Sequence, residues 1–211
     1  MTIAAIDVDP QQTFTPLCPD ELPVEGGDKI GAALNAQAAL GTYRVLTKDA
    51  HPRDAVWVVN RHDEMLQPLT HKNADLTWVA HAVPGTQGFE TIPSLPAVTE
   101  YDHVIWKGIE PDLHPYGACY HDLEEKLSTG LIEWLASKGV TTLIVGGLAT
   151  DYCVKTTALQ LKATGQFDVI VNLEACRGIA TETVESACME MKAAGIHVVI
   201  NTDAVKQRLA I

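Results

Sequence analysis

The chain has 211 residues, 46% of them hydrophobic and 20% charged, and a formal net charge of −12. This length suits one α/β domain with a substantial core, and the negative charge argues against a nucleic acid or an anionic membrane as partner. The five cysteines are scattered and form no CxxC pair, which is typical of reduced thiols rather than a disulfide framework. Because the first residues hold no basic segment and no apolar stretch reaches transmembrane length, we expect a cytoplasmic protein.

Short apolar runs alternate with amphipathic stretches along the chain. The predicted strands, in chain order, are Ile3–Val8, Tyr43–Thr47, His103–Trp106, Thr142–Val145, Asp168–Val171 and His197–Ile200. The predicted helices are Asp28–Leu40, Leu123–Lys138, Asp151–Thr164, Thr181–Ala194 and Asp203–Leu209. Strands and helices that alternate at this spacing predict right-handed crossovers and a mostly parallel sheet with helices on both faces. We therefore expect residues 1–211 to form a single doubly wound α/β domain.

Residues 48–100 interrupt this alternation. They hold four of the eight histidines, two of the four tryptophans and five of the eleven prolines, with little periodicity. A long irregular insertion in a compact domain is more often functional than a plain connection. We therefore expect the segment at about 48–100 to be a ligand-binding insertion.

The segment GGLATDYCV places Cys153 directly after a predicted strand-to-helix turn. Thr150 and Asp151, which follow the glycines, are residue types that commonly begin a helix. A thiol in the first turn of a helix lies near free N–H groups and the positive end of the helix dipole, so we expect Cys153 to ionise easily. The alternative is a small cysteine buried in the core, which is the commonest role of a free cysteine.

Two charged residues follow other predicted strands: Asp9 comes after Ile3–Val8, and Lys107 comes after His103–Trp106. Ligands of doubly wound sheets bind outside the carboxyl ends of the strands, so these side chains and the Cys153 thiol are expected to converge. An ammonium favours a thiolate, and a carboxylate can take and return a proton, so the three would form a nucleophilic system. Taken singly, Asp9 could cap a loop and Lys107 could be a solvated charge.

Asp49 and His51 stand two residues apart in KDAHP, after another predicted strand. Alternate side chains of an extended chain point to the same side, so the carboxylate and the imidazole face one point. Oxygen and nitrogen ligands of this type suit zinc, iron or manganese. The alternative is a hydrogen-bonded Asp–His pair. A metal site needs a further ligand, for which the nearby candidates are His62, His71 and His81.

Taken together, these segments resemble the nicotinamidase branch of the isochorismatase-like cysteine hydrolases. GGLATDYCV is similar to that family's nucleophile segment, DPQQTF to its D-x-Q-x-x-F opening, WKG to its lysine segment and KDAHP to its metal-binding D-x-H-P. WVAHAVPGTQGFE resembles W-P-x-H-C-V-x-G-T-x-G, whose histidine is a metal ligand. KGIEPDLHPYGACY and EACRGI also have counterparts, so the match runs across nearly the whole chain.

The resemblance implies the catalytic residues. It selects Asp9 as the catalytic acid, with Lys107 beside it and Cys153 as the nucleophile. The first motif reads IDVDPQQTF, with two aspartates, so Asp7 would inherit the role if the register were shifted. Backbone N–H groups of Ala149 and Cys153 would form the oxyanion hole, and family members have a cis peptide bond before this alanine.

The resemblance also implies a metal and a substrate pocket. It selects His81 as the third metal ligand beside Asp49 and His51. The ion would be zinc or iron, with manganese as a further candidate. Some relatives use an additional ligand, for which His62 and Glu64 are the available residues. The residues expected to contact the substrate are Phe14, Trp78 and Tyr116.

The function implied by the resemblance is an amidohydrolase that converts nicotinamide to nicotinate and ammonia through a cysteine thioester, as in NAD salvage. The metal would hold the pyridine nitrogen, and pyrazinamide would be a related substrate. One alternative is another amide or a carbamoyl compound as substrate of the same three residues. A second alternative is a catalytically idle homologue that acts as a binding protein. A homo-oligomer is compatible with the sequence, which does not specify the oligomeric state.

Overall fold

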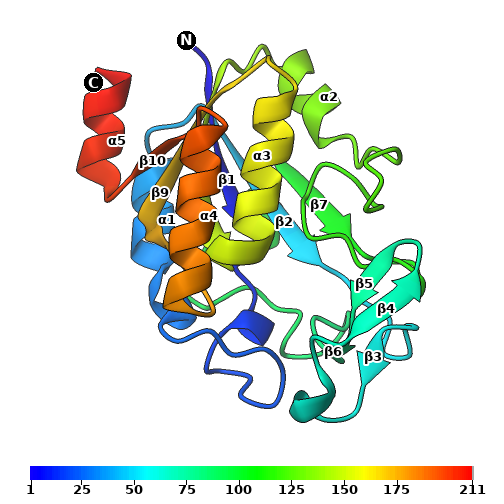
Figure 1. The fold of residues 1–211 in the computed structure, drawn as a ribbon. Coiled ribbons are helices and arrows are strands. Elements are labelled where there is room, and N and C mark those ends of the chain that lie inside the picture. The colour runs from blue at the N-terminus through cyan, green and yellow to red at the C-terminus, as the bar shows by residue number, and fades with distance from the viewer. Residues whose placement is uncertain (211) are drawn as a thin grey trace.

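The computed structural model describes residues 1–210. Its centre is a six-stranded sheet in the order β10-β9-β8-β1-β2-β7, in which every neighbouring pair is parallel (Figure 1). The strands are β1 Ile3–Val8, β2 Tyr43–Asp49, β7 His103–Lys107, β8 Thr142–Leu148, β9 Asp168–Arg177 and β10 His197–Val199. The predicted doubly wound parallel sheet is confirmed.

Five α-helices cover the two faces of the sheet. They are α1 Gly31–Ala38, α2 Leu131–Ser137, α3 Lys155–Ala163, α4 Thr181–Ala193 and α5 Thr202–Leu209. Helices α1 and α5 pack on each other and on β9, whereas α3 and α4 form a second layer that lies in front of the sheet in Figure 1. Leu135 of α2 shares an apolar cluster with Leu161 of α3 and Met191 of α4.

The central strands are buried on both faces because their sequences are almost entirely apolar, with Asp7 as the one charged residue of β1. All residues of β1 and β8 are buried. Along β8, Leu143 and Val145 join the apolar cluster of α2, α3 and α4, while Ile144 between them packs with Leu209 of α5. Successive side chains of a strand point to opposite faces, so one apolar run supplies both layers of the core.

The strand order reverses beside β1. The chain runs from β1 through β2 to β7 on one side, then returns to β8 on the other side of β1 and continues to β9 and β10. In sheets of this kind the ligand binds outside the carboxyl ends of the strands at the point of reversal. The topology therefore points to the ends of β1 and β8 as the location of a site.

One predicted helix is wrong over its first half. Leu123–Lys138 was expected to be helical, but α2 begins only at Leu131. The carboxylate of Asp122 accepts hydrogen bonds from the backbone N–H groups of Lys126 and Leu127, each at 2.9 Å, which favours a turn. Gly130 then adopts a positive φ of 86°, outside the helical region.

Residues 50–100 have little regular structure, as predicted, but they contain two small sheets. Strands β3 Val58–Val59 and β6 Trp78–Val79 pair with each other, as do β4 Pro68–His71 and β5 Ala74–Leu76. Trp57 and Trp78 form an apolar cluster of their own with Ala55 and Ala74. The insertion lies beyond the carboxyl ends of β2 and β7 (Figure 1). Within residues 1–210, no helix is both long enough and apolar enough to cross a membrane.

Asp7 lies in the middle of the sheet, where it is fully buried. Its carboxylate accepts hydrogen bonds from Arg44 Nε at 2.8 Å and from the Tyr101 hydroxyl at 2.9 Å. Burial raises the pKa of Asp7 to about 6, although Arg44 and Tyr101 favour its charged form. This aspartate is therefore a structural group that binds a proton more readily in the folded chain than in the unfolded one.

The pKa of Asp7 predicts a specific dependence of stability on pH. A carboxyl whose folded pKa is raised adds stability below about pH 4, its unfolded value, and that stability is lost as the pH rises through 6. The free energy of unfolding of the native sequence, minus that of Asp7→Asn, should therefore fall by about 2 kcal/mol from pH 4 to pH 7. Urea unfolding of both proteins at several pH values measures this difference, and a difference that does not change with pH would contradict the prediction.

Candidate active site

Four strands end at the same place and each brings one reactive side chain there. Asp9 follows β1, Asp49 ends β2, Lys107 ends β7, and Cys153 lies just after β8. Each of the four is almost completely buried. The convergence of Asp9, Lys107 and Cys153, which was expected from strand ends alone, is thus present in the structure.

Lys107 is the centre of this group. Its ammonium Nζ contacts Asp9 Oδ2 at 3.0 Å and donates a short hydrogen bond to Asp49 Oδ1. It also lies 3.7 Å from the sulfur of Cys153. Burial acts to lower the pKa of Lys107, but the carboxylates of Asp49 and Asp9 outweigh it and raise the pKa well above its ordinary value. Lys107 is therefore a permanent cation between two acids and a thiol.

Asp9 is held in a defined orientation by Thr47 of the neighbouring strand. The Asp9 N–H donates to the carbonyl and to the hydroxyl oxygen of Thr47, each at 3.1 Å. The Thr47 hydroxyl in turn donates to Asp9 Oδ1 at 2.5 Å, which leaves Oδ2 facing Lys107. Burial raises the pKa of Asp9 above its ordinary value, against the effect of Lys107. A carboxylate with a raised pKa is a better proton acceptor.

Cys153 lies in a π-helical turn, Thr150–Val154, that leads into α3. Burial raises the pKa of its thiol well above the ordinary value, and the nearby carboxylates of Asp9 and Asp49 raise it further, although Lys107 acts to lower it. The expectation of an easily ionised thiol is therefore wrong. Desolvation and the two nearby carboxylates outweigh the start of the helix and the ammonium, so the resting thiol keeps its proton.

Three imidazoles form a second group next to the first. Those of His51, His81 and His114 are buried, and they present potential ligand atoms within 4.8 Å of one another. The Nδ1 of His51 donates to the Gly108 carbonyl at 3.0 Å, and that of His81 donates to the Val79 carbonyl at 2.8 Å. Because Nδ1 carries the proton, Nε2 of each ring has a free lone pair.

The electrostatics of two of these rings, His81 and His114, favour the neutral form that a metal requires. Burial lowers the pKa of His81 to about 3 and that of His114 well below its ordinary value. Asp49 links the two groups, since its Oδ1 lies 3.4 Å from His51 Nε2 and also contacts Lys107. A carboxylate and neutral imidazoles with free lone pairs fit one divalent ion.

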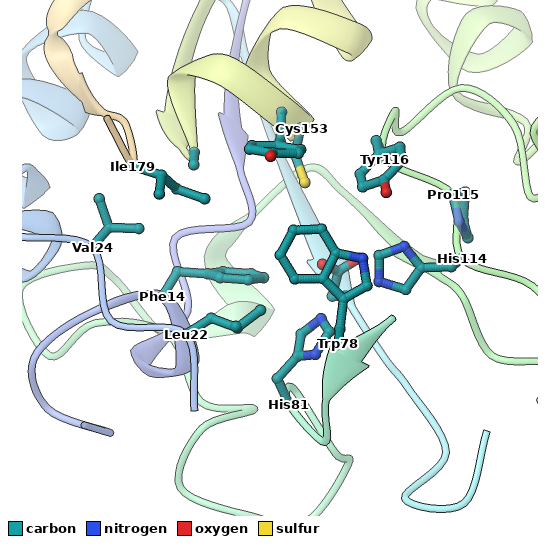
Figure 2. Close-up of a pocket in the computed structure, with 13 residues that line it drawn as sticks. Phe14, Leu22, Val24, Trp78, His81, His114, Pro115, Tyr116, Cys153 and Ile179 are labelled. Carbon is teal, nitrogen blue, oxygen red and sulfur yellow. The ribbon is translucent and has the colours of Figure 1, made fainter. Parts of the chain in front are cut away.

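A pocket of about 420 Å³ of empty space, including its open mouth, lies over both groups. In Figure 2 the sulfur of Cys153 points into the pocket, toward the aromatic and imidazole side chains that line it. The ring of Trp78 stacks on His114, with 5.7 Å between centroids and 10° between planes. The three residues expected to contact the substrate all line this pocket: Phe14, Trp78 and Tyr116.

Two buried residues with clear structural roles at the site were not singled out from the sequence. Gln11 donates from its amide to the Asp49 carbonyl at 2.9 Å and accepts from the Asp49 N–H at 2.7 Å, so it fixes the end of β2. It is the Gln of DPQQTF, and its recurrence in the family motif could have drawn attention to it. His114 stands in KGIEPDLHPYGACY, but nothing in that segment indicated that it would join the other histidines.

Other histidines and acids of the insertion lie apart from the site. His62 is exposed and its Nε2 bonds to the Glu21 carbonyl at 2.8 Å, while Glu64 pairs with Arg61 at 3.5 Å. His71 is exposed at the end of β4. Asp7 contacts Arg44 rather than this group. The cis peptide bond predicted between Leu148 and Ala149 is present, and both Ala149 and Cys153 line the pocket.

Residues 4–204 of the chain match the isochorismatase domain. The chain belongs to the isochorismatase family. It is 30% identical over 200 residues to the nicotinamidase of Acinetobacter baylyi, covering 92% of this chain and 90% of that protein. The nicotinamidase/pyrazinamidase structure of Acinetobacter baumannii superposes with a TM-score of 0.84 at 30% identity, covering 96% of this chain and 98% of that one. The pyrazinamidase of Pyrococcus horikoshii, solved in complex with zinc, gives a TM-score of 0.73 at 30% identity, covering 95% and 99%.

The contact between Lys107 and Cys153 predicts how the thiol reacts. Iodoacetamide should alkylate Cys153 slowly at pH 7, because the thiolate is the reacting form and the thiol is protonated. Lys107→Met should slow this alkylation by a further factor of about ten or more, since loss of the ammonium raises the pKa of the thiol further and leaves less thiolate. Time-resolved peptide mapping gives the rate, and circular dichroism shows whether the variant is folded.

Cys18, on the loop that follows Phe14, is the internal control in this experiment. It is partly exposed, and its alkylation rate should be the same in both proteins. An unchanged rate at Cys153 in the folded Lys107→Met variant would contradict the assigned role of the ammonium.

Proposed function

We propose that this isochorismatase-family chain is a nicotinamidase, which hydrolyses nicotinamide to nicotinate and ammonia as a step of NAD salvage. The observation that carries the proposal is the joining of two groups at one pocket. A buried thiol, ammonium and carboxylate lie beside a cluster of buried imidazoles and Asp49. The first group suits attack on an amide, and the second suits a metal that orients a heteroaromatic ring. The nicotinamidase relatives described above, at about 30% identity over nearly the whole chain, support the same substrate.

The reaction begins at Cys153 and Asp9. As the sulfur attacks the amide carbon, the thiol proton moves to the Asp9 carboxylate, a C–S bond forms and the carbonyl electrons move onto oxygen. The N–H groups of Ala149 and Cys153 stabilise this oxyanion, and donors of this type contribute about 3–4 kcal/mol each. Lys107 remains charged and stabilises the developing thiolate.

The second half of the reaction returns the proton. Asp9 donates it to the amide nitrogen, and the C–N bond breaks. Ammonia departs, and the acyl group remains bound to Cys153 as a thioester. Asp9, again a carboxylate, takes a proton from water as the water oxygen attacks the thioester carbon. The C–S bond breaks, nicotinate is released and the thiol recovers its proton.

A divalent ion completes the substrate site in this proposal. Asp49, His51 and His81 hold it, and the donor types suit zinc or iron, with manganese as a further candidate. When bound, the ion supplies a Lewis acid for the pyridine nitrogen of the substrate. The pocket walls Phe14, Trp78 and Tyr116 would position the substrate ring beside the Cys153 sulfur.

We also place the enzyme in the cytoplasm, with small molecules as its partners. All five cysteines fall within residues 1–210 and are free, which supports a reducing compartment. The small pocket supports a compact substrate such as nicotinamide or pyrazinamide.

A panel of amides tests the proposed function. Ammonia release should be fast with nicotinamide and pyrazinamide and much slower with benzamide, which lacks the ring nitrogen that the metal would hold. N-carbamoyl amino acids should give no turnover. If only a carbamoyl compound releases ammonia rapidly, the proposed substrate is wrong and a carbamoyl compound takes its place. If no compound of the panel is hydrolysed, the result favours a catalytically idle binding homologue.

Replacement of Asp9 separates the catalytic aspartate from the structural one. Asp9→Asn is nearly isosteric but cannot carry the proton, so kcat should fall by about 10²–10⁴-fold with the fold intact. Asp7→Asn should keep most of the turnover, because Asp7 contacts Arg44 and Tyr101 rather than the thiol. Steady-state kinetics of both variants, with thermal melting as the check on folding, measure this. Near-normal rates for Asp9→Asn combined with an inactive Asp7→Asn would show that the roles are reversed.

A further inference from the structure

His114 is buried without any hydrogen-bond partner for its side chain. It is 4% exposed, and within residues 1–210 neither Nδ1 nor Nε2 finds a partner. His51 and His81, in contrast, each use Nδ1 to bind a backbone carbonyl. An unsatisfied polar group in the interior costs about 1–3 kcal/mol. A ring with two unpartnered nitrogens at the base of a pocket is therefore in a position suited to a ligand.

The backbone holds His114 firmly in this position. Its N–H donates to the Asn73 carbonyl at 2.7 Å, and the preceding Leu113 carbonyl accepts from Trp57 Nε1 at 3.0 Å. Both partners belong to the insertion that also carries His51. These two hydrogen bonds connect the loop after β7 to the insertion at His114. The backbone therefore fixes the position from which the His114 ring extends into the pocket.

The three imidazoles are close enough to share one ion. The ring of His114 stacks on that of His51 with centroids 5.0 Å apart, and it lies 5.7 Å from that of His81. Their potential ligand atoms lie within 4.8 Å of one another. Nitrogen atoms about 2.1 Å from one ion are separated by roughly 3.0–4.2 Å, depending on the coordination geometry. Small rotations of the rings would bring the three nitrogens into this range.

We propose that His114 is a direct protein ligand of the metal, so that three imidazoles and the Asp49 carboxylate hold the ion. This inference rests on the metal site of the proposed function and adds a ligand that the sequence did not predict. A fourth protein ligand leaves two open positions on a six-coordinate ion, enough for the substrate nitrogen and one water. A set with three nitrogen donors also favours zinc, iron or cobalt over manganese.

Metal affinity, measured without substrate, tests this assignment. Metal-free protein is titrated with zinc against a competing chelator dye, for the native sequence and for His114→Ala and His114→Gln. Both variants should bind zinc more than about 100-fold more weakly, because residues that only orient a ligand already contribute roughly 10–100-fold. Cobalt-substituted protein should show altered visible absorption bands in both variants, since one nitrogen donor is lost.

His121→Gln is the matched control. His121 belongs to the same loop after β7 but is not part of the imidazole cluster, so its replacement should leave zinc affinity and the cobalt spectrum unchanged. Thermal melting of the metal-free proteins shows whether each variant is folded. An equal loss of zinc in the His114 and His121 variants would reflect a general change in the loop and would overturn the assignment.

The alternative role of His114 is a wall for the substrate, since its ring stacks on Trp78. Zinc affinity equal to that of the native sequence, with only KM for nicotinamide raised, would establish that role and overturn the proposal. The proposed function fails in a different way. If the native protein releases no ammonia from nicotinamide while zinc binding still depends on His114, the substrate is wrong and the ligand assignment stands.

Discussion

A buried ammonium between two carboxylates is the interaction on which the rest of the site depends. Lys107 is completely buried, and its charge is compatible with that position only because Asp9 and Asp49 contact it. Removing one partner of such a buried group typically costs about 3–5 kcal/mol, because an uncompensated charge is left behind. The ion pairs also affect the reactivity of Cys153, since the two carboxylates that contact Lys107 disfavour a third negative charge nearby. The enzyme therefore needs a proton acceptor at the moment of attack, and Asp9 lies in the right place.

This cluster exists because of the sheet topology. The four side chains come from positions 9, 49, 107 and 153, and only parallel strands that end at one edge bring them together. The reversal of strand order beside β1 leaves that edge open between the layers of helices. The insertion of residues 50–100 then covers part of this opening with Trp78 and His81, whose rings form one wall of the pocket.

The sequence was most informative where local pattern determines structure. Largely apolar runs predicted both ends of β1 and the start of β8, although β8 continues for three residues beyond the predicted end at Val145. The carboxyl-end rule then predicted that Asp9, Lys107 and Cys153 would meet. Two features could not be obtained in this way. The pKa of the thiol depends on burial and on charges that are distant in sequence, so the helix start alone gave the wrong direction. His114 belongs to an irregular loop without periodicity, and its approach to His51 depends on backbone contacts with Asn73 and Trp57.

Asp49 connects the two halves of the site electrostatically. One of its oxygens contacts Lys107 and lies near Nε2 of His51, and Gln11 fixes its backbone from both sides. Two carboxylates face a single ammonium, so the group carries excess negative charge, which makes a cation beside His51 favourable. A cation there would compete with Lys107 for the Asp49 carboxylate. Lys107 would then be less neutralised by Asp49, and its charge would favour the thiolate of Cys153 more strongly. In the proposed mechanism, Asp49 would thereby link the positioning of the substrate to the activation of Cys153.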